Sequence, residues 1–198
     1  QVPFADRENG FVMIGRVVPS KRVELAVEIV RQLREHHGHT IQLHIIGRAD
    51  NAFAETLKQL LSDKPWAHWH SDLDRTGLER LAGRMKWGLH CYRYEHYGLA
   101  PAELQALGCI TFVHDSGGQR EIVTNPSLRY QDLEDAVRKI TAVMTAPAMQ
   151  SQLLAEIELS NMKHRAERFD RGYVSIVKDL LALHRSEAPP SVNVSATG

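Results

Sequence analysis

Short apolar segments rich in β-branched and aromatic residues alternate along this chain with longer segments in which apolar residues recur every three or four positions. The short segments end in polar or Gly-containing turns and predict strands. They are Phe11–Ile14, Ile41–Ile46, Ala67–His70, Trp87–Cys91 and Cys109–Val113, with a shorter sixth at Leu128–Tyr130. The longer segments predict helices at Lys21–His36, Ala52–Ser62, Thr76–Lys86, Leu99–Leu107 and Gln119–Thr124.

The alternation of single strands with single helices defines the expected fold. It predicts right-handed βαβ units and an α/β fold with a doubly wound, parallel, Rossmann-like sheet. After Gln131 the pattern is helical to about His184, so C-terminal helices should follow the sheet. We expect a linker at 1–10, one domain at 11–185 and a flexible tail at 186–198, where two Pro lie among small polar residues.

Composition limits the class of protein. The chain has 198 residues, 43% of them apolar, and its 24 basic side chains balance its 24 acidic ones. A soluble domain of this size can bury a full core, and no apolar run is long enough to span a membrane. The neutral net charge argues against nucleic acid as the main partner. Because the chain begins at Gln1, without an initiator Met or signal segment, we expect a piece of a longer protein.

The two cysteines, Cys91 and Cys109, lie near the end of one predicted strand and the start of the next. In a parallel sheet these positions are at opposite edges, so the two thiols should not form a disulfide. We expect both to be reduced thiols of the core. That is consistent with a cytoplasmic location.

Polar and glycine residues follow each of the five main predicted strands. In a doubly wound sheet, ligands bind outside the carboxyl ends of the strands, so these residues predict one binding edge. They are Gly15-Arg16, Gly47-Arg48, His70-Ser71, Arg93-Tyr94-Glu95 and His114-Asp115-Ser116-Gly117-Gly118.

Glu95 and Glu103 are separated by seven residues that include Gly98 and Pro101. Gly permits a tight entry and Pro is favoured in a first helical turn, so a helix should begin near Leu99. Its free N–H groups can hold a phosphate, while carboxylates on either side suit sugar and ribose hydroxyls. The alternative is an acid at a helix N-terminus followed by a solvated Glu.

Arg16 and Lys21 flank the turn after the first predicted strand. A guanidinium and an ammonium there could bind one diphosphate, or they could be an ordinary surface Arg and a first-turn Lys. The amides of Ser116-Gly117-Gly118 could line the same cleft, or these residues could only connect a strand to a helix.

Together these motifs resemble a known family. The matching segments are Gly15 to Arg22, Glu95 to Glu103, Gly108, Ser116-Gly117-Gly118 and Glu121-Ile122-Val123. In this order they resemble the retaining GT-B glycosyltransferases of the glycosyl transferases group 1 type. The resemblance covers about Phe11 to Val123, with a looser match near Phe169 to Leu183.

The resemblance implies the C-terminal, donor-binding half of a two-domain hexosyltransferase of glycan or glycoconjugate biosynthesis. A missing N-terminal domain would bind the acceptor, so this fragment alone should be inactive. A nucleotide-diphosphate sugar would be the donor substrate, with no metal and no other cofactor. Peripheral membrane association of the full protein stays open.

The resemblance also implies roles for single residues. Arg16 and Lys21 would bind the donor diphosphate, Glu95 would orient the transferred sugar, and Glu103 would hold the ribose. The remaining expected donor contacts come from two turns: Gly15, His96, Gly98, Leu99 and Ala100. His96 could meet sugar or phosphate, or only fill its loop. Electrostatic stabilisation of the leaving diphosphate would be the main catalytic contribution.

Five positions depart from the family pattern. Cys91-Tyr92 stands where Pro-Ser is common, His96 and Arg22 stand where Gly is common, and Ile110 replaces a frequent Pro. These departures bear on donor and sugar preference more than on the fold.

The sequence also allows or excludes several other functions. A nicotinamide-dependent oxidoreductase would need Gly-x-Gly-x-x-Gly, which the turn at Gly15 lacks. A non-catalytic nucleotide-sugar-binding module and a sugar-nucleotide epimerase of the same architecture stay open. Asp72-Leu73-Asp74 could suggest a metal site, but Asp74 fits better as a helix cap. His68 and His70 have no carboxylate partner set and are interpreted as solvated or structural.

Overall fold

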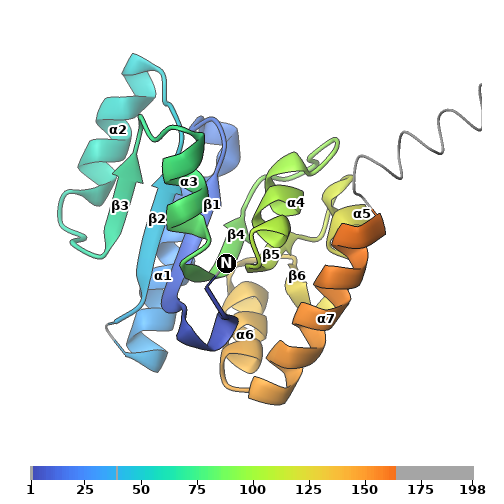
Figure 1. The fold of residues 1–198 in the computed structure, drawn as a ribbon. Helices are drawn as coiled ribbons and strands as arrows, with labels where there is room; N and C mark the ends of the chain where they lie inside the picture. The colour runs from blue at the N-terminus through green and yellow to red at the C-terminus, as the bar shows by residue number, and fades with distance from the viewer. Residues whose placement is uncertain (1, 39, 164–198) are drawn as a thin grey trace, which may run out of the picture. The chain divides into compact units, whose positions relative to one another are not determined.

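The computed structural model describes residues 2–38 and 40–163, and in this part of the chain a six-stranded parallel sheet forms the centre (Figure 1). The strands are β1 (Glu8–Ile14), β2 (Gln42–Ile46), β3 (Ala67–His70), β4 (Met85–His90), β5 (Ile110–His114) and β6 (Arg129–Tyr130). Their order is β3-β2-β1-β4-β5-β6. The chain therefore builds outward from β1 and then returns to its other side at β4, which confirms the predicted doubly wound sheet.

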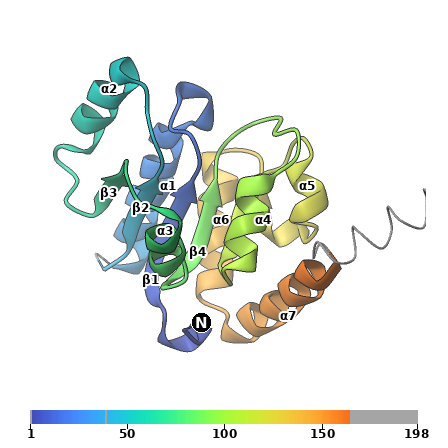
Figure 2. The same cartoon turned by 45° about the horizontal axis from the view of Figure 1, so that its top comes forward.

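Helices follow the strands as the sequence predicts. They are α1 (Val23–His37), α2 (Asn51–Leu61), α3 (Arg75–Ala82), α4 (Leu99–Ala106), α5 (Gln119–Ile122), α6 (Leu133–Met144) and α7 (Pro147–Lys163). Short 3₁₀ turns occupy Phe4–Asp6, Pro19–Lys21 and Pro126–Leu128. Figure 2 shows α3 and α4 on the near side of the sheet and α1 and α6 on the far side.

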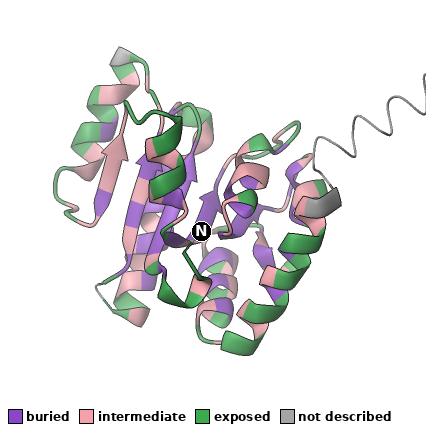
Figure 3. Ribbon diagram, viewed as in Figure 1, coloured by how far each residue is buried: buried purple, intermediate pink, exposed green. Residues whose placement is uncertain are grey.

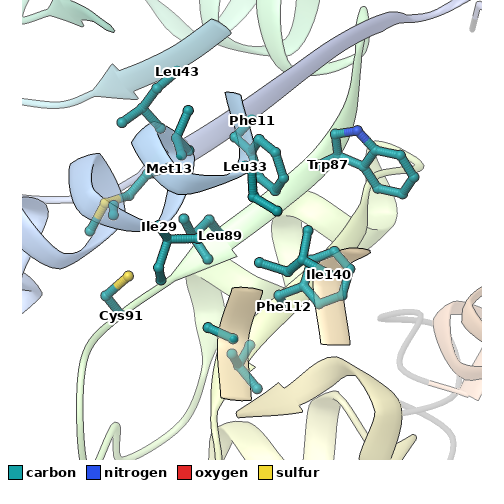
Figure 4. Close-up of a cluster of buried hydrophobic side chains, with 14 of the residues drawn as sticks. Phe11, Met13, Ile29, Leu33, Leu43, Trp87, Leu89, Cys91, Phe112 and Ile140 are labelled. Carbon is teal, nitrogen blue, oxygen red and sulfur yellow. The ribbon is translucent and has the colours of Figure 1, made fainter. Parts of the chain in front are cut away.

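The alternation of side chains along β1 places apolar groups in two layers. Phe11 and Met13 belong to the larger core cluster with residues of α1, whereas Val12 and Ile14 belong to a second cluster with residues of α3 and α4. The larger cluster appears in Figure 4, and Figure 3 shows that buried residues concentrate in the strands. The sheet is thus fixed from both faces, and the loops at its carboxyl edge are held by rigid strands.

The first strand begins earlier than predicted. Residues 8–10, expected as linker, are part of β1: the Glu8 N–H donates to the Arg84 carbonyl, and Gly10 is in register with Gln42 of β2. The prediction relied on apolar segments, so it did not include the polar residues with which this strand starts.

Two helix boundaries also differ from the prediction. Met85 and Lys86, predicted to end a helix, open β4 instead, because α3 already ends at Ala82 and the Gly83 N–H caps it through the Glu79 carbonyl. At the start of α3, the Asp74 carboxylate accepts from the Gly77 N–H, so the predicted cap is confirmed. The first helix starts at Val23 rather than Lys21, after the 3₁₀ turn.

Cys91 and Cys109 are buried free thiols, as predicted. Burial raises the pKa of each to about 12. The expected closing helix near Phe169 to Leu183 and the tail at 186–198 lie outside the described residues. Within 2–38 and 40–163, none of the helices combines the length and the apolar character needed to cross a membrane.

Candidate functional site

The loops after β1 and β4 meet where the strand order reverses, and there they bring together residues from two predicted motifs. The Lys21 ammonium donates to Glu95 Oε2 at 2.9 Å and lies 4.3 Å from the centre of the Tyr92 ring. Both charged side chains are largely buried, with exposed fractions of 18% and 17%. Ligands of doubly wound sheets bind at such a reversal.

The charge of Glu95 is stabilised by its neighbours. Burial alone would raise the pKa of Glu95, but the hydrogen bond and the charge of Lys21, with a smaller contribution from His90, lower it below its usual value. His90 Nε2 lies 3.3 Å from Glu95 Oε2, and the His96 N–H donates to Oε1 at 3.2 Å. Glu95 is therefore an ionised carboxylate with a partner on each oxygen.

The loop that carries Glu95 is packed against the glycine-rich loop after β5. The Gly118 N–H donates to the Glu95 carbonyl at 2.6 Å. Gly117 has a φ of 65°, and a Cβ there would lie 2.4 Å from that same carbonyl oxygen. Ser116-Gly117-Gly118 was expected either to line the cleft or only to connect a strand to a helix. The described contacts add a packing role, since glycine lets the two loops approach this closely.

A second set of hydrogen bonds holds the same loop. Arg93 Nε donates to His114 Nε2 at 3.1 Å, so a neutral His114 ring carries its proton on Nδ1 and donates to Ser116 Oγ at 2.8 Å. That hydroxyl oxygen also accepts from the Tyr94 N–H, at 2.9 Å. These bonds fix Tyr94 in a left-handed conformation with a φ of 58°, just before Glu95.

The helix α4 begins at Leu99, as predicted. Gly98 is its N-cap and has a φ of 81°, a conformation that glycine adopts without strain. The first N–H groups of the helix, including those of Leu99 and Ala100, have no acceptor within the helix and carry its positive dipole end. This end can hold an anion, provided that one reaches it.

A pocket of about 360 Å³ opens at the carboxyl ends of β1, β2 and β3, beside the start of α4. Its lining residues are Ile14, Gly15, Ile46, Gly47, Arg48, His70, Ser71, Leu73, Arg75, Leu78, Leu99, Ala100 and Glu103. Inside it the Glu103 carboxylate pairs with the Arg75 guanidinium, which also donates to Glu79 at 2.5 Å. The pocket thus offers a carboxylate, a guanidinium and apolar walls to a ligand.

The structure brings most of the predicted site residues to this edge. Gly15, Leu99, Ala100 and Glu103 line the pocket, while Lys21 and Glu95 form the neighbouring ion pair. The side chains of Arg16 and His96 are exposed. None of the described residues pairs with the Arg16 guanidinium.

Three contributing residues escaped the sequence analysis: His90 and Tyr92, which contact Glu95 and Lys21, and Arg75, which holds Glu103. His90 could have been predicted from its place at the end of the strand that leads to Glu95. Arg75 gave none, because its partner is 28 positions away. Among residues 2–38 and 40–163, no group of three or more His, Cys, Asp or Glu side chains could hold a metal ion.

Comparison with known proteins places this geometry in a family. Residues 1–157 match the family described as glycosyl transferases group 1, so the chain belongs to that family. It is also similar to the GDP-Man:Man(3)GlcNAc(2)-PP-Dol alpha-1,2-mannosyltransferase of Candida glabrata, with 28% identity over 129 residues. The match covers 58% of this chain and 25% of the relative, so the chain spans about a quarter of that protein's length.

Solved structures confirm the fold. The catalytic domain of the cholesterol-alpha-glucosyltransferase from Helicobacter pylori matches with a TM-score of 0.67 and 16% identity, covering 80% of this chain and 99% of that one. The C-terminal domain of a glycosyl transferase group 1 family protein from Francisella tularensis matches with a TM-score of 0.67 and 14% identity, covering 79% and 85%. At these identities the likeness establishes the Rossmann-like fold of GT-B glycosyltransferases.

Proposed function

We propose that this chain is the donor-binding half of a retaining glycosyltransferase, which moves a hexose from a nucleotide-diphosphate sugar to an acceptor hydroxyl in glycan or glycoconjugate biosynthesis. The observation that carries the proposal is the Lys21–Glu95 pair at the reversal of the sheet, next to the pocket that contains Glu103. The cation and the start of α4 would suit phosphate, and the two carboxylates would suit hydroxyls of sugar and ribose.

In this proposal each group has a distinct contact with the donor. Arg16, Lys21 and the amides at the start of α4 bind the diphosphate, and Gly15 leaves room beside it. Glu95 orients hydroxyls of the transferred sugar, with His96 beside it, and Glu103 accepts from the ribose hydroxyls. Arg75, which now pairs with Glu103, would give way to or join the ribose contact.

The proposed chemistry is stabilisation of the leaving group. Negative charge grows on the nucleotide diphosphate as the glycosidic bond breaks, and fixed cations and amides offset it. The departing phosphate then accepts the proton of the acceptor hydroxyl, which attacks the same face of the sugar. Glu95 acts by orientation and electrostatics, so the mechanism needs neither a metal ion nor a protein nucleophile.

The acceptor side of the reaction belongs to another part of the enzyme. We propose an N-terminal acceptor-binding domain as the partner, a cytoplasmic location, and no transfer activity for this chain alone. The mannosyltransferase of Candida glabrata uses GDP-mannose, as its name states, which makes GDP the first nucleotide to test. A non-catalytic nucleotide-sugar-binding module and an epimerase share the binding residues and are separated from the transferase only by an activity assay.

Calorimetric titration of this chain with GDP, UDP and ADP tests the proposal. We expect one nucleotide to bind, and Lys21→Ala and Glu103→Ala each to weaken that binding about 10-fold or more, through lost phosphate and ribose contacts. Lys58→Ala is the matched control, since Lys58 pairs with Glu55 on α2, away from the pocket. The absence of binding by all three nucleotides would contradict a donor site in this chain.

A further inference from the structure

His90 is the last residue of β4, and none of its side-chain surface is exposed. Its Nε2 faces Glu95 Oε2 at 3.3 Å, whereas its buried Nδ1 has no hydrogen-bond partner among the described residues. A neutral imidazole carries one proton, and only Nε2 has an acceptor to receive it. The ring therefore donates from Nε2 to the carboxylate.

The charge state of His90 agrees with this arrangement. Burial lowers the pKa of His90 to about 4, and the charge of Lys21 acts in the same direction, while Glu95 opposes it. The ring is neutral at pH 7, so its bond to Glu95 is a hydrogen bond between a neutral donor and a charged acceptor. The Tyr92 ring packs edge-on against the imidazole, at 6.4 Å between centres and 82° between planes.

Lys21 and His90 both bind the same oxygen, Glu95 Oε2. A donor diphosphate carries more negative charge than one carboxylate, and it would draw the flexible ammonium of Lys21 away from Glu95. The imidazole cannot follow, because it sits on a strand, is fully buried and carries no charge. After the exchange, Glu95 would keep one donor on each oxygen: His90 on Oε2 and the His96 N–H on Oε1.

We propose that His90 is a positioning residue, which keeps the Glu95 carboxylate directed toward the sugar while Lys21 turns to the donor diphosphate. The inference rests on the proposed function of the site. In the donor-bound state, His90 would hold the orientation of the Glu95 carboxylate, and Lys21 would exchange Glu95 for the diphosphate.

The hydrogen bond itself can be tested without any donor. The Glu95 carboxyl pKa would be measured in this chain by ¹³C NMR for the wild type, His90→Leu and His90→Gln. We expect His90→Leu to raise the Glu95 pKa toward its usual value and His90→Gln to leave it low, because the Gln amide can donate in place of Nε2. His37→Gln is the control, since that ring bonds to Thr141 away from the site. An unchanged Glu95 pKa in His90→Leu would overturn the inference.

Turnover separates positioning from support of the fold. In the enzyme that joins this chain to its acceptor-binding half, we expect His90→Leu to lower kcat by about 10- to 100-fold and to leave nucleoside diphosphate affinity within about 2-fold. His90→Gln should restore most of kcat. If both variants lose nucleotide affinity and thermal stability together, His90 only supports the fold and the inference is wrong.

The two proposals fail in different ways. A wild-type chain that binds no nucleotide contradicts the proposed function, and the Glu95 titration still decides whether His90 holds that carboxylate. A wild-type chain that binds its nucleotide, with His90→Leu unchanged in kcat, contradicts the inference alone.

Discussion

Lys21 and Glu95, which lie 74 positions apart in the chain, neutralise each other across the reversal of the sheet, with Nζ 2.9 Å from Oε2. Partly buried charges of this kind are costly to separate unless each gains a new partner. In the proposed function, a nucleotide-diphosphate sugar would supply both partners, phosphate for the ammonium and hydroxyls for the carboxylate. If the ion pair exchanges partners in this way, removal of the ammonium and removal of the carboxylate should have opposite effects on binding.

Substitution of the two partners gives the first prediction. Lys21→Gln should weaken nucleoside diphosphate binding by about 10- to 100-fold, because a charge-assisted contact to phosphate is lost. Glu95→Gln should leave that affinity unchanged or raise it by a few-fold, because the ammonium no longer has a competing carboxylate. Calorimetry on the isolated chain measures both, with Lys58→Gln as the control. Equal losses in the two variants would show that the pair supports the fold rather than competing with the ligand.

Gly117 allows a second prediction about the loop that carries Glu95. Gly117→Ala should destabilise the chain by about 1–3 kcal/mol through overpacking, in addition to about 1 kcal/mol for its left-handed backbone. Gly38→Ala measures backbone strain without a clash, since an added Cβ at Gly38 would meet nothing within 4 Å, although its φ of 99° and ψ of 158° lie in a region that only glycine adopts readily. Urea unfolding measures the loss in the free energy of unfolding for both variants. The two losses show how much of the Gly117 effect comes from the clash with the Glu95 carbonyl. A loss of no more than about 1 kcal/mol in Gly117→Ala, the cost of the left-handed backbone alone, would refute a packing role for Gly117.

The parallel sheet and most of its helices could be predicted because periods of two and about 3.6 residues are local properties of the sequence. The ends of elements were less predictable, since they depend on backbone hydrogen bonds between distant segments. Residues 8–10 belong to β1 despite their polar character, because Glu8 pairs with Met85 of β4 and Gly10 with Gln42 of β2. Lys86 follows a helix that ends at Ala82.

The candidate site, like the fold, could be predicted only in part. Its position could be predicted, because the carboxyl ends of parallel strands share an edge whatever their side chains are. Its pairings could not, because the contacts of Lys21 with Glu95 and of Arg75 with Glu103 join segments that only the folded chain brings together. The motif residues could be named from the sequence, but the pairing of Lys21, Glu95 and Glu103 with opposite charges could not.

Arg22, which stands where glycine is common in the family, gives a third prediction. Its φ is 54°, in the left-handed region that glycine adopts without penalty, and one of its guanidinium nitrogens is buried without a hydrogen-bond partner. Arg22→Gly should therefore raise the free energy of unfolding by about 0.5–1 kcal/mol. Urea unfolding measures this, and Arg22→Ala, which keeps the backbone strain, separates it from the side-chain effect. A loss of stability in Arg22→Gly would mean that the Arg22 side chain contributes more than its backbone costs.

The dependence of stability on pH follows from one buried histidine, His90, and one half-buried histidine, His44. Burial lowers the pKa of His90 to about 4, and burial together with the charges of His68, His70 and Arg84 lowers that of His44 to about 4. An unfolded chain protonates its histidines near about pH 6.5. Between these values the unfolded state binds more protons than the folded state, so stability must fall as the pH is lowered.

We expect the free energy of unfolding to fall between about pH 6.5 and pH 4, by on the order of 3 kcal/mol at most for His90 and by less for His44, whose charge solvent partly screens. Urea unfolding at pH 7.5, 6.0 and 4.5 measures the loss, and His44→Leu and His90→Leu should each remove part of it. His36→Gln, an exposed substitution at the end of α1, controls for the loss of a histidine as such. If both Leu variants keep the full pH dependence of the wild type, the folded chain must protonate these imidazoles as readily as the unfolded chain does, and the hydrogen bond from a neutral His90 to Glu95 would fail with it.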